Sequence, residues 1–153
     1  MIKLVKGKGA GNTPLGAFDN ALYNCGIHNH NLIYLSSVIP SGQEVEIVER
    51  FKDSKRWGSK LYVVMAHEEN DNVAQASIGW LYDKESGNGL FVEHNGTHSI
   101  KDNLDTLDDL AHTRCIKDYS KNTLCQVSKK ENGEEYVCAM VVAVFEEEDW
   151  RTL

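Results

Sequence analysis

Apolar residues recur at helical spacing in two stretches of the chain, which predicts two amphipathic helices. The first helix is expected to follow a cap at Asn12 or Thr13, with Pro14 in its first turn. Gly26 is expected to end it, because glycine readily adopts the left-handed conformation that closes a helix. The predicted buried stripe of this helix consists of Leu15, Phe18, Leu22 and Cys25.

The second helix is expected to begin at Ser99 or Asp102 and to run to about Asp118. Short apolar runs and alternation of apolar with polar residues predict a series of strands around the two helices. These strands are expected at residues 2–5, 61–66, 73–82 and 89–94, with a short or irregular edge strand in 44–51 and a final hairpin of 124–128 with 136–145.

The order of these elements predicts an α+β fold, with helices packed outside mostly antiparallel or mixed sheets. The length of 153 residues suits a single domain, residues 1–153. Three alternating glycines in residues 7–11 predict a turn that permits close backbone approach. The acidic residues 146–149 are expected to form a solvated tail.

The apolar run in the centre of the sequence, residues 32–39, predicts a buried strand that ends at Pro40. Ser36 and Ser37 stand inside this run. Two hydroxyl groups in a core strand are unfavourable unless each has a hydrogen-bond partner. One explanation is that both bond to nearby backbone; the other is that the pair carries chemistry.

Composition narrows the classes of function. A formal net charge of −7 argues against a nucleic-acid partner, since phosphate binding needs clustered lysine and arginine. No apolar run is long enough to span a membrane, and the start of the sequence lacks the hydrophobic core of a signal peptide, so the expected location is cytoplasmic. The 4 cysteines show no metal-ligand spacing, and His28 with His30 lack a third nearby ligand, so no metal is expected.

Three motifs give the serine pair a specific meaning. The sequences AFDNAL at residues 17–22, NLI at 31–33 and LSSVIP at 35–40 together resemble the processing site of the pyruvoyl-dependent arginine decarboxylases. This resemblance implies that the chain cuts itself between Ser36 and Ser37 into a β subunit, 1–36, and an α subunit, 37–153. Ser37 would then become the pyruvoyl group. Cys25 and Ser41 depart from the family pattern, where alanine and a second proline are expected.

The resemblance also assigns roles to three polar residues. Asn31 would donate a hydrogen bond to the oxyanion during cleavage; the alternative is that it only satisfies a turn or strand end. Glu93 would be the proton donor, although an acid in an apolar strand can equally face solvent. Asp19 would bind a guanidinium group through two parallel hydrogen bonds, whereas its place at the margin of a helix stripe alone suggests a solvated flank.

The implied reaction converts L-arginine to agmatine and carbon dioxide, a step that can serve either polyamine supply or acid resistance. The implied cofactor is a pyruvoyl group derived from Ser37, in place of pyridoxal phosphate and with no metal. The family further implies a four-layer α/β/β/α sandwich and a homotrimer or a dimer of trimers. Two alternatives stay open: the same chemistry on another amino acid, and an uncleaved scaffold or binding subunit without activity.

Overall fold

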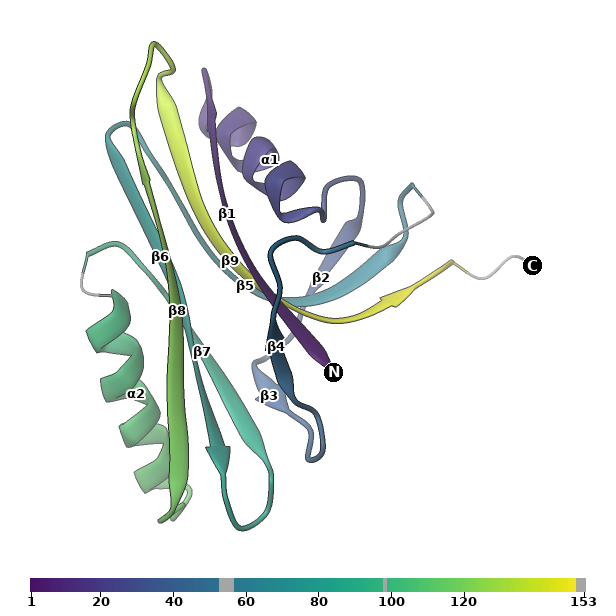
Figure 1. Cartoon of the computed structure of the whole chain (residues 1–153), viewed down its shortest axis with the longest axis vertical. Coiled ribbons are helices and arrows are strands. Elements are labelled where there is room, and N and C mark those ends of the chain that lie inside the picture. The colour runs from purple at the N-terminus through teal and green to yellow at the C-terminus, as the bar shows by residue number, and fades with distance from the viewer. Residues whose placement is uncertain (53–56, 98, 151–153) are drawn as a thin grey trace.

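The computed structural model describes residues 1–52, 57–97 and 99–150. Within these residues the chain forms an α+β fold of two helices and two sheets, compatible with an α/β sandwich (Figure 1). The helices are α1, Pro14–Cys25, and α2, Ser99–Thr113. The strands are β1, Ile2–Gly11; β2, Asn31–Tyr34; β3, Val38–Ile39; β4, Val45–Ile47; β5, Lys60–Asn70; β6, Val73–Asp83; β7, Gly89–Asn95; β8, Tyr119–Lys129; and β9, Tyr136–Glu148.

The strands divide between a five-stranded and a four-stranded sheet. The five-stranded sheet has the order β2-β5-β9-β1-β4 and is mixed, because β1 with β4 and β2 with β5 run parallel. The four-stranded sheet has the order β3-β7-β6-β8 and is antiparallel throughout. Asp71 and Asn72 connect β5 to β6 and thereby carry the chain from one sheet to the other.

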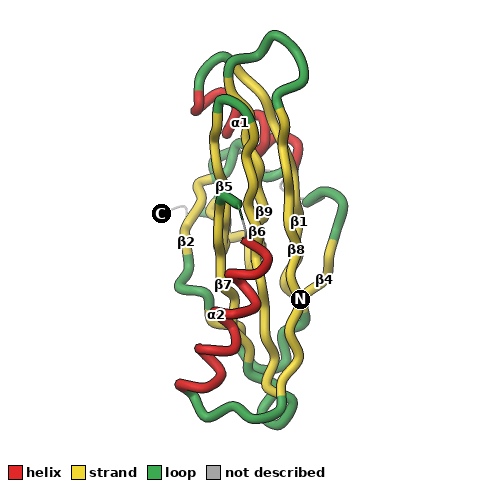
Figure 2. The backbone as a smooth tube through the Cα atoms, turned by 90° about the vertical axis from the view of Figure 1, so that its left-hand side faces the viewer, coloured by secondary structure: helices red, strands yellow, loops and turns green. Residues whose placement is uncertain are grey.

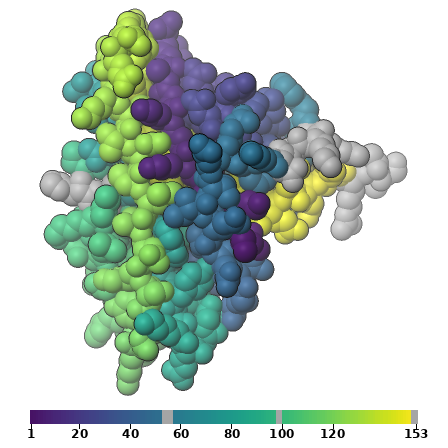
Figure 3. Space-filling model, viewed as in Figure 1, coloured from purple at the N-terminus to yellow at the C-terminus, as the bar shows by residue number. Residues whose placement is uncertain are grey.

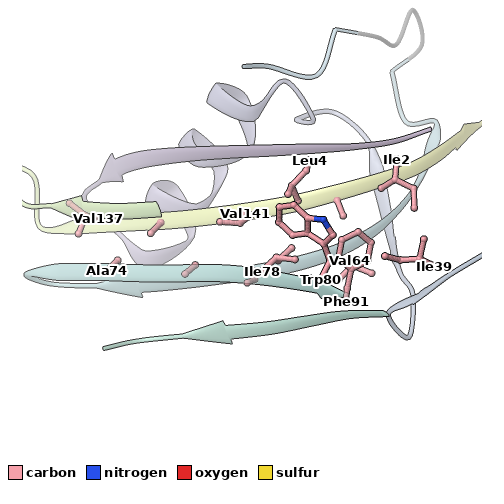
Figure 4. Packing of buried hydrophobic residues seen from close by; sticks show 14 residues of the cluster. Ile2, Leu4, Ile39, Val64, Ala74, Ile78, Trp80, Phe91, Val137 and Val141 are labelled. Carbon is pink, nitrogen blue, oxygen red and sulfur yellow. The ribbon is translucent and has the colours of Figure 1, made fainter. Parts of the chain in front are cut away.

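Apolar side chains from both sheets meet in one core (Figure 4). Ile2, Leu4 and Val64 point into it from the five-stranded sheet, and Ile78 and Phe91 from the four-stranded sheet. Figure 3 shows one side of this arrangement, where β8, in lime, lies beside the purple residues of β1. The alternation of inward and outward residues along each strand therefore fixes which side chains fill the space between the sheets.

The glycines of residues 7–11 belong to strand β1, so the predicted turn there is wrong. They allow α1 to pack directly on the strand. A β-carbon on Gly9 would stand 2.5 Å from the Ala17 carbonyl oxygen, and one on Gly11 would stand 2.7 Å from the Ala17 nitrogen. The expected close approach of backbone at residues 7–11 is therefore present, but the chain does not turn there.

The same close approach changes the buried stripe of α1. Ala17, Ala21 and Cys25 are its buried residues, whereas Leu15 is 74% exposed and was wrongly placed in the core. The predicted ends of the helix are confirmed: the Thr13 hydroxyl accepts a 2.9 Å bond from the Gly16 nitrogen, and Gly26 adopts φ 84°. Small residues pack here because nothing larger fits between helix and strand.

Helix α2 lies over β6 and β7 of the four-stranded sheet (Figure 2). Its start at Ser99 agrees with the sequence, but it ends at Thr113 rather than near Asp118. Leu107 and Ala111 are its fully buried residues. They pack with Leu81 and Val92 of the sheet.

Two strand predictions at the end of the chain are wrong. The strands β8 and β9 do not pair with each other: β8 pairs with β6, and β9 pairs with β1 and β5. The predicted acidic tail continues β9 as far as Glu148. Glu147 contacts the His30 ring at 3.1 Å, and Glu148 contacts the Lys60 ammonium at 3.0 Å. These carboxylates are paired because the strand carries them alongside the start of β2 and β5.

Candidate active site

The chain passes from one sheet to the other at the serine pair. Strand β2 pairs with β5 in the five-stranded sheet, and β3 pairs with β7 in the four-stranded sheet. Residues 35–37 connect them, so the predicted continuous buried strand over 32–39 is wrong. Ser36 is exposed, and the flanking Tyr34 and Val38 are 62% and 59% exposed. The apolar pattern misled because it reflects two short edge strands and the link between them.

The backbone at Ser37 is in an unfavourable conformation. Its φ of 69° lies in the left-handed region, which costs a residue other than glycine about 1–3 kcal/mol. Hydrogen bonds hold both sides of the link: the Leu35 nitrogen donates to Val63 at 2.9 Å, and the Phe91 nitrogen donates to the Ser37 carbonyl at 2.8 Å. The sheets thus fix the serine pair in a strained link.

The side chain of Ser37 contacts a glutamate that is distant in the sequence. Its hydroxyl donates to Glu93 Oε2 at 3.1 Å, with Oε1 at 3.5 Å, although the residues are 56 positions apart. Glu93 lies on β7, two residues after Phe91, and therefore on the same face of the sheet. The contact follows from the bond between the Phe91 nitrogen and the Ser37 carbonyl, which aligns the link with β7.

Two opposing effects act on the pKa of Glu93. Burial of part of the side chain disfavours the charged form and raises the pKa above its usual value. The Ser37 hydroxyl and the nearby His94 favour the carboxylate and offset part of that rise. The net direction is upward.

A pocket of about 310 Å³ opens beside Glu93. Its lining comes from two strands in different sheets: Met65, Ala66 and His67 of β5, and Glu93, His94 and Asn95 of β7. The Asn95 amide donates to the His67 carbonyl at 3.2 Å and connects the two strands across it. The pocket therefore lies between the edges of the two sheets, on the side where the serine link joins them.

Two predicted site residues lie apart from the Ser37–Glu93 pair. The Asn31 amide donates to the Gly58 carbonyl at 2.7 Å, at the start of β2. Asp19 is exposed on α1, and within the described residues it makes no hydrogen bond or ion pair. Its neighbour Phe18 contacts the His67 ring, with centroids 4.8 Å apart and the ring planes tilted by 58°, so this turn of α1 borders the pocket wall.

The histidines of the pocket were not predicted as site residues. Neither His67 nor His94 lies in a motif, and strand alternation predicts that His94 faces the opposite side of β7 from Glu93. Across the part of the chain that the structure describes, no group of three histidine, cysteine or acidic side chains could hold a metal ion. No helix among the described residues is long and apolar enough to cross a membrane.

Comparison with known proteins connects this geometry to a family. A family model described as "Pyruvoyl-dependent arginine decarboxylase" matches residues 1–149. The chain belongs to this family. Among curated pyruvoyl-dependent arginine decarboxylases, the chain is 38% identical over 93 residues to the protein of Halobacterium salinarum, a match that covers 60% of the chain and 58% of that relative.

Two methanogen pyruvoyl-dependent arginine decarboxylases match over longer regions. The protein of Methanocaldococcus jannaschii is 26% identical over 143 residues, 93% of the chain and 87% of the relative. That of Methanococcus aeolicus is 35% identical over 117 residues, 73% of the chain and 68% of the relative. The match to the Halobacterium relative spans less than two thirds of that protein's length, at 58%.

Proposed function

We propose that this protein decarboxylates L-arginine to agmatine and carbon dioxide, using a pyruvoyl group that it makes from Ser37. The observation that carries the proposal is the Ser37–Glu93 contact in a strained link between two sheets. Membership of the pyruvoyl-dependent arginine decarboxylase family supports the same chemistry.

Self-cleavage would occur between Ser36 and Ser37, giving pieces 1–36 and 37–153 of one domain. The Ser37 oxygen attacks the Ser36 carbonyl carbon, and the peptide C–N bond breaks as an ester C–O bond forms. Elimination then removes the hydrogen on the Ser37 α-carbon and breaks the bond between its β-carbon and oxygen, which releases piece 1–36 as a carboxylate and leaves dehydroalanine at position 37. Water hydrolyses the dehydroalanine to the pyruvoyl group, and its nitrogen leaves as ammonia. The left-handed backbone at Ser37 supports this assignment, because strain in the starting peptide lowers the cost of leaving it. Asn31 is proposed as the oxyanion donor, after its amide has moved from Gly58.

The residues around Ser37 fit a pyruvoyl group at this position. Ser37 supplies its atoms, and Glu93 faces them from β7. In place, the group supplies an electron sink for the electrons left when carbon dioxide departs. Glu93 holds a proton through its raised pKa and delivers it to the substrate carbon. The pocket beside Glu93 gives the substrate a place to bind.

Asp19 is proposed to bind the substrate guanidinium. Because it lies on α1 without contact to the Ser37–Glu93 pair, we propose that Asp19 acts in the site of a neighbouring copy. A homotrimer, or a dimer of trimers, would provide this arrangement. The exposed apolar side chains of Tyr34 and Val38 beside the serine link support a contact between copies at this edge.

The proposed layer order is α/β/β/α. Three apolar clusters support it: α1 packs on the five-stranded sheet, the two sheets share a core, and α2 packs on the four-stranded sheet. In this arrangement the serine link and the pocket would lie on one side of the two inner layers.

The test is intact mass under denaturing conditions, with Ser37→Ala as the uncleaved control. We expect two pieces from the wild type, split after Ser36, with a blocked N-terminus on the larger piece. The native cleaved protein, with both pieces present, should release carbon dioxide from arginine and form agmatine. A full-length wild type of unchanged mass contradicts the proposal and favours the scaffold alternative. If the cleaved protein decarboxylates lysine or histidine but not arginine, the proposed pyruvoyl chemistry stands and the proposed substrate is wrong.

A further inference from the structure

A chain of buried polar side chains lies under α2, next to the pocket. Asn103 and Ser77 are each 0% exposed, among the apolar side chains that bind α2 to its sheet. The Asn103 amide nitrogen donates to the Ser77 hydroxyl at 2.6 Å and to the Thr123 hydroxyl at 3.4 Å. A β-carbon on Gly79 would stand 2.9 Å from that of Asn103, so glycine makes room for the amide.

The Thr123 hydroxyl determines which group donates in each of these hydrogen bonds. The Thr123 hydroxyl donates its hydrogen to the Ile78 carbonyl at 3.3 Å, so its oxygen must accept from Asn103. The amide nitrogen therefore faces the two hydroxyls, and the amide oxygen faces His94 Nδ1 at 2.5 Å. An amide oxygen only accepts hydrogen bonds, so Nδ1 of His94 must carry a hydrogen.

The other ring nitrogen of His94, Nε2, makes no hydrogen bond among the described residues. His94 also lines the pocket that contains Glu93. With Nδ1 held as a donor to Asn103, the lone pair of Nε2 is free to accept a hydrogen bond. Neighbouring residues of a strand face opposite sides, so the imidazole and the Glu93 carboxylate lie on opposite faces of β7. Among the described residues no strand pairs with this edge of β7 beyond Phe91, and Glu93 is exposed there, so water can connect the two faces around the edge.

The polar and ionisable groups on the elements around His94 leave its Nε2 accessible to water. On β7 the neighbouring ionisable group is Glu93, and on α2 the residue before Asn103 is Asp102. On β5, His67 is paired with Glu69 at 2.9 Å. The partners on β6 and β8 are the neutral hydroxyls of Ser77 and Thr123, and the remaining acid near β6, Glu68, accepts from the Gln75 nitrogen at 3.1 Å.

We propose that His94 carries protons from solvent to Glu93, and that Asn103 is the positioning residue that keeps Nε2 of His94 available. The proposal rests on the proposed function. Replacing a carboxylate by hydrogen consumes one proton each turnover, so Glu93 must be recharged from water. His94 gives the Nε2 proton to the Glu93 carboxylate through pocket water, and then takes a proton from bulk water.

The first experiment measures the protonation of the His94 ring directly and does not depend on enzyme activity. Ser37→Ala protein with ¹⁵N-labelled histidine is titrated by NMR, alone and with Asn103→Asp. We expect the His94 ring to show a hydrogen on Nδ1 throughout. Asn103→Asp should raise the pKa of His94, because a carboxylate facing Nδ1 stabilises the imidazolium. A His94 ring with its hydrogen on Nε2, or a pKa unmoved by Asn103→Asp, overturns the positioning role.

The second experiment uses the cleaved enzyme with His94→Gln, whose amide can still bond Asn103 but cannot carry a proton. We expect kcat to fall by about tenfold with KM little changed, less than the hundredfold or more that a general acid itself contributes. Imidazole added to the buffer should restore part of kcat. His112→Gln, on the exposed end of α2, is the matched control and should leave kcat and its pH profile unchanged.

The outcomes separate the two proposals. A folded, cleaved His94→Gln with unchanged kcat, or with raised KM and no response to imidazole, overturns the proton carrier. A wild type that forms no agmatine overturns the proposed function, while the NMR titration still decides the role of Asn103. If His94→Gln does not fold, Asn103→Asp in the cleaved enzyme decides: it should shift the pH profile of kcat, and an unshifted profile contradicts the proposal.

Discussion

The hydrogen bond from Ser37 to Glu93 affects the charge of the acid before Ser37 is converted. The hydroxyl donates to the carboxylate and so lowers the pKa that burial raises. The proposed conversion of Ser37 to a pyruvoyl group would remove this donor, because a ketone oxygen only accepts hydrogen bonds. Glu93 should therefore hold its proton more firmly after cleavage than before it.

This expectation can be measured in uncleaved protein. Asn31→Ala, expected to remain uncut, keeps the Ser37 hydroxyl, and Asn31→Ala with Ser37→Ala lacks it. The pKa of Glu93, followed by ¹³C NMR of labelled glutamate, should be higher in the double variant. Intact mass must first show both chains uncut. Equal pKa values in the two variants would contradict a role for the hydroxyl.

Glu93→Gln tests the proposed role of Glu93 as proton donor. Glutamine keeps the shape of the side chain and can still contact Ser37, but it has no acidic proton to deliver. We expect agmatine formation to fall by about a hundredfold or more, the usual contribution of a general acid. In the wild type, activity should fall as pH rises through the raised pKa of Glu93, because the protonated form is the active one. Undiminished activity in folded Glu93→Gln would exclude Glu93 as the donor.

Among the elements, the packing of α1 on β1 depends on glycine. Alternate residues of β1 face the helix, and its backbone is too close for any side chain at Gly9. Interiors are packed so tightly that one added methyl group must displace its neighbours. The close contact would matter for the proposed function, because α1 carries Asp19 and leads, through Gly26, into β2 and the serine link.

Gly9→Ala should destabilise the fold. The new methyl group would meet the Ala17 carbonyl oxygen at 2.5 Å and the Asn20 carbonyl carbon at 2.8 Å, and both are backbone atoms that cannot turn away. We expect a loss of about 1–3 kcal/mol in the free energy of unfolding, measured by urea denaturation. Gly133→Ala is the control, since nothing lies within 4 Å of its added carbon. Equal urea midpoints for the two variants would show that α1 can shift.

Local signals in the sequence predicted elements better than pairings. Thr13, Pro14 and Gly26 define α1 through neighbouring backbone, so its bounds could be predicted. The glycines of β1 could not be distinguished from a turn, because their partner is a helix that the sequence places after them. The separation of β8 from β9 depends on which sheet each strand joins, and short-range patterns carry no information about that.

The candidate site was predictable where a motif existed and unpredictable elsewhere. The serine pair and Glu93 came from resemblance, and the structure brings Ser37 and Glu93 into contact. The left-handed backbone at Ser37 and the neighbours of His94 arise from contacts between distant segments. Asn103 looked like an ordinary polar residue of a helix, because only the tertiary structure buries it.

For the whole molecule, the proposed cut separates pieces that share a core. Piece 1–36 contains β1, which lies between β9 and β4 within the five-stranded sheet, and α1, which covers that sheet. Val5 and Ala21 of this piece are fully buried against residues of the other. Breaking one peptide bond in the exposed serine link removes none of these contacts.

We therefore expect the two pieces to stay together after cleavage. Native size-exclusion chromatography should elute them as one species, and denaturant should be needed to separate them. Uncleaved Ser37→Ala should elute at the same position. Loss of the small piece from native protein would contradict the central place of β1 in the sheet.

The position of the link also determines how the protein can be rebuilt after unfolding. An uncut chain folds as one molecule, at a rate independent of concentration. Once the chain is cut, two separate molecules must meet before β1 can insert between β9 and β4, so recovery becomes a second-order process that slows on dilution. After the proposed cleavage, an unfolded molecule would refold only slowly. The lifetime of the cleaved protein would then depend on a slow rate of unfolding and not on refolding.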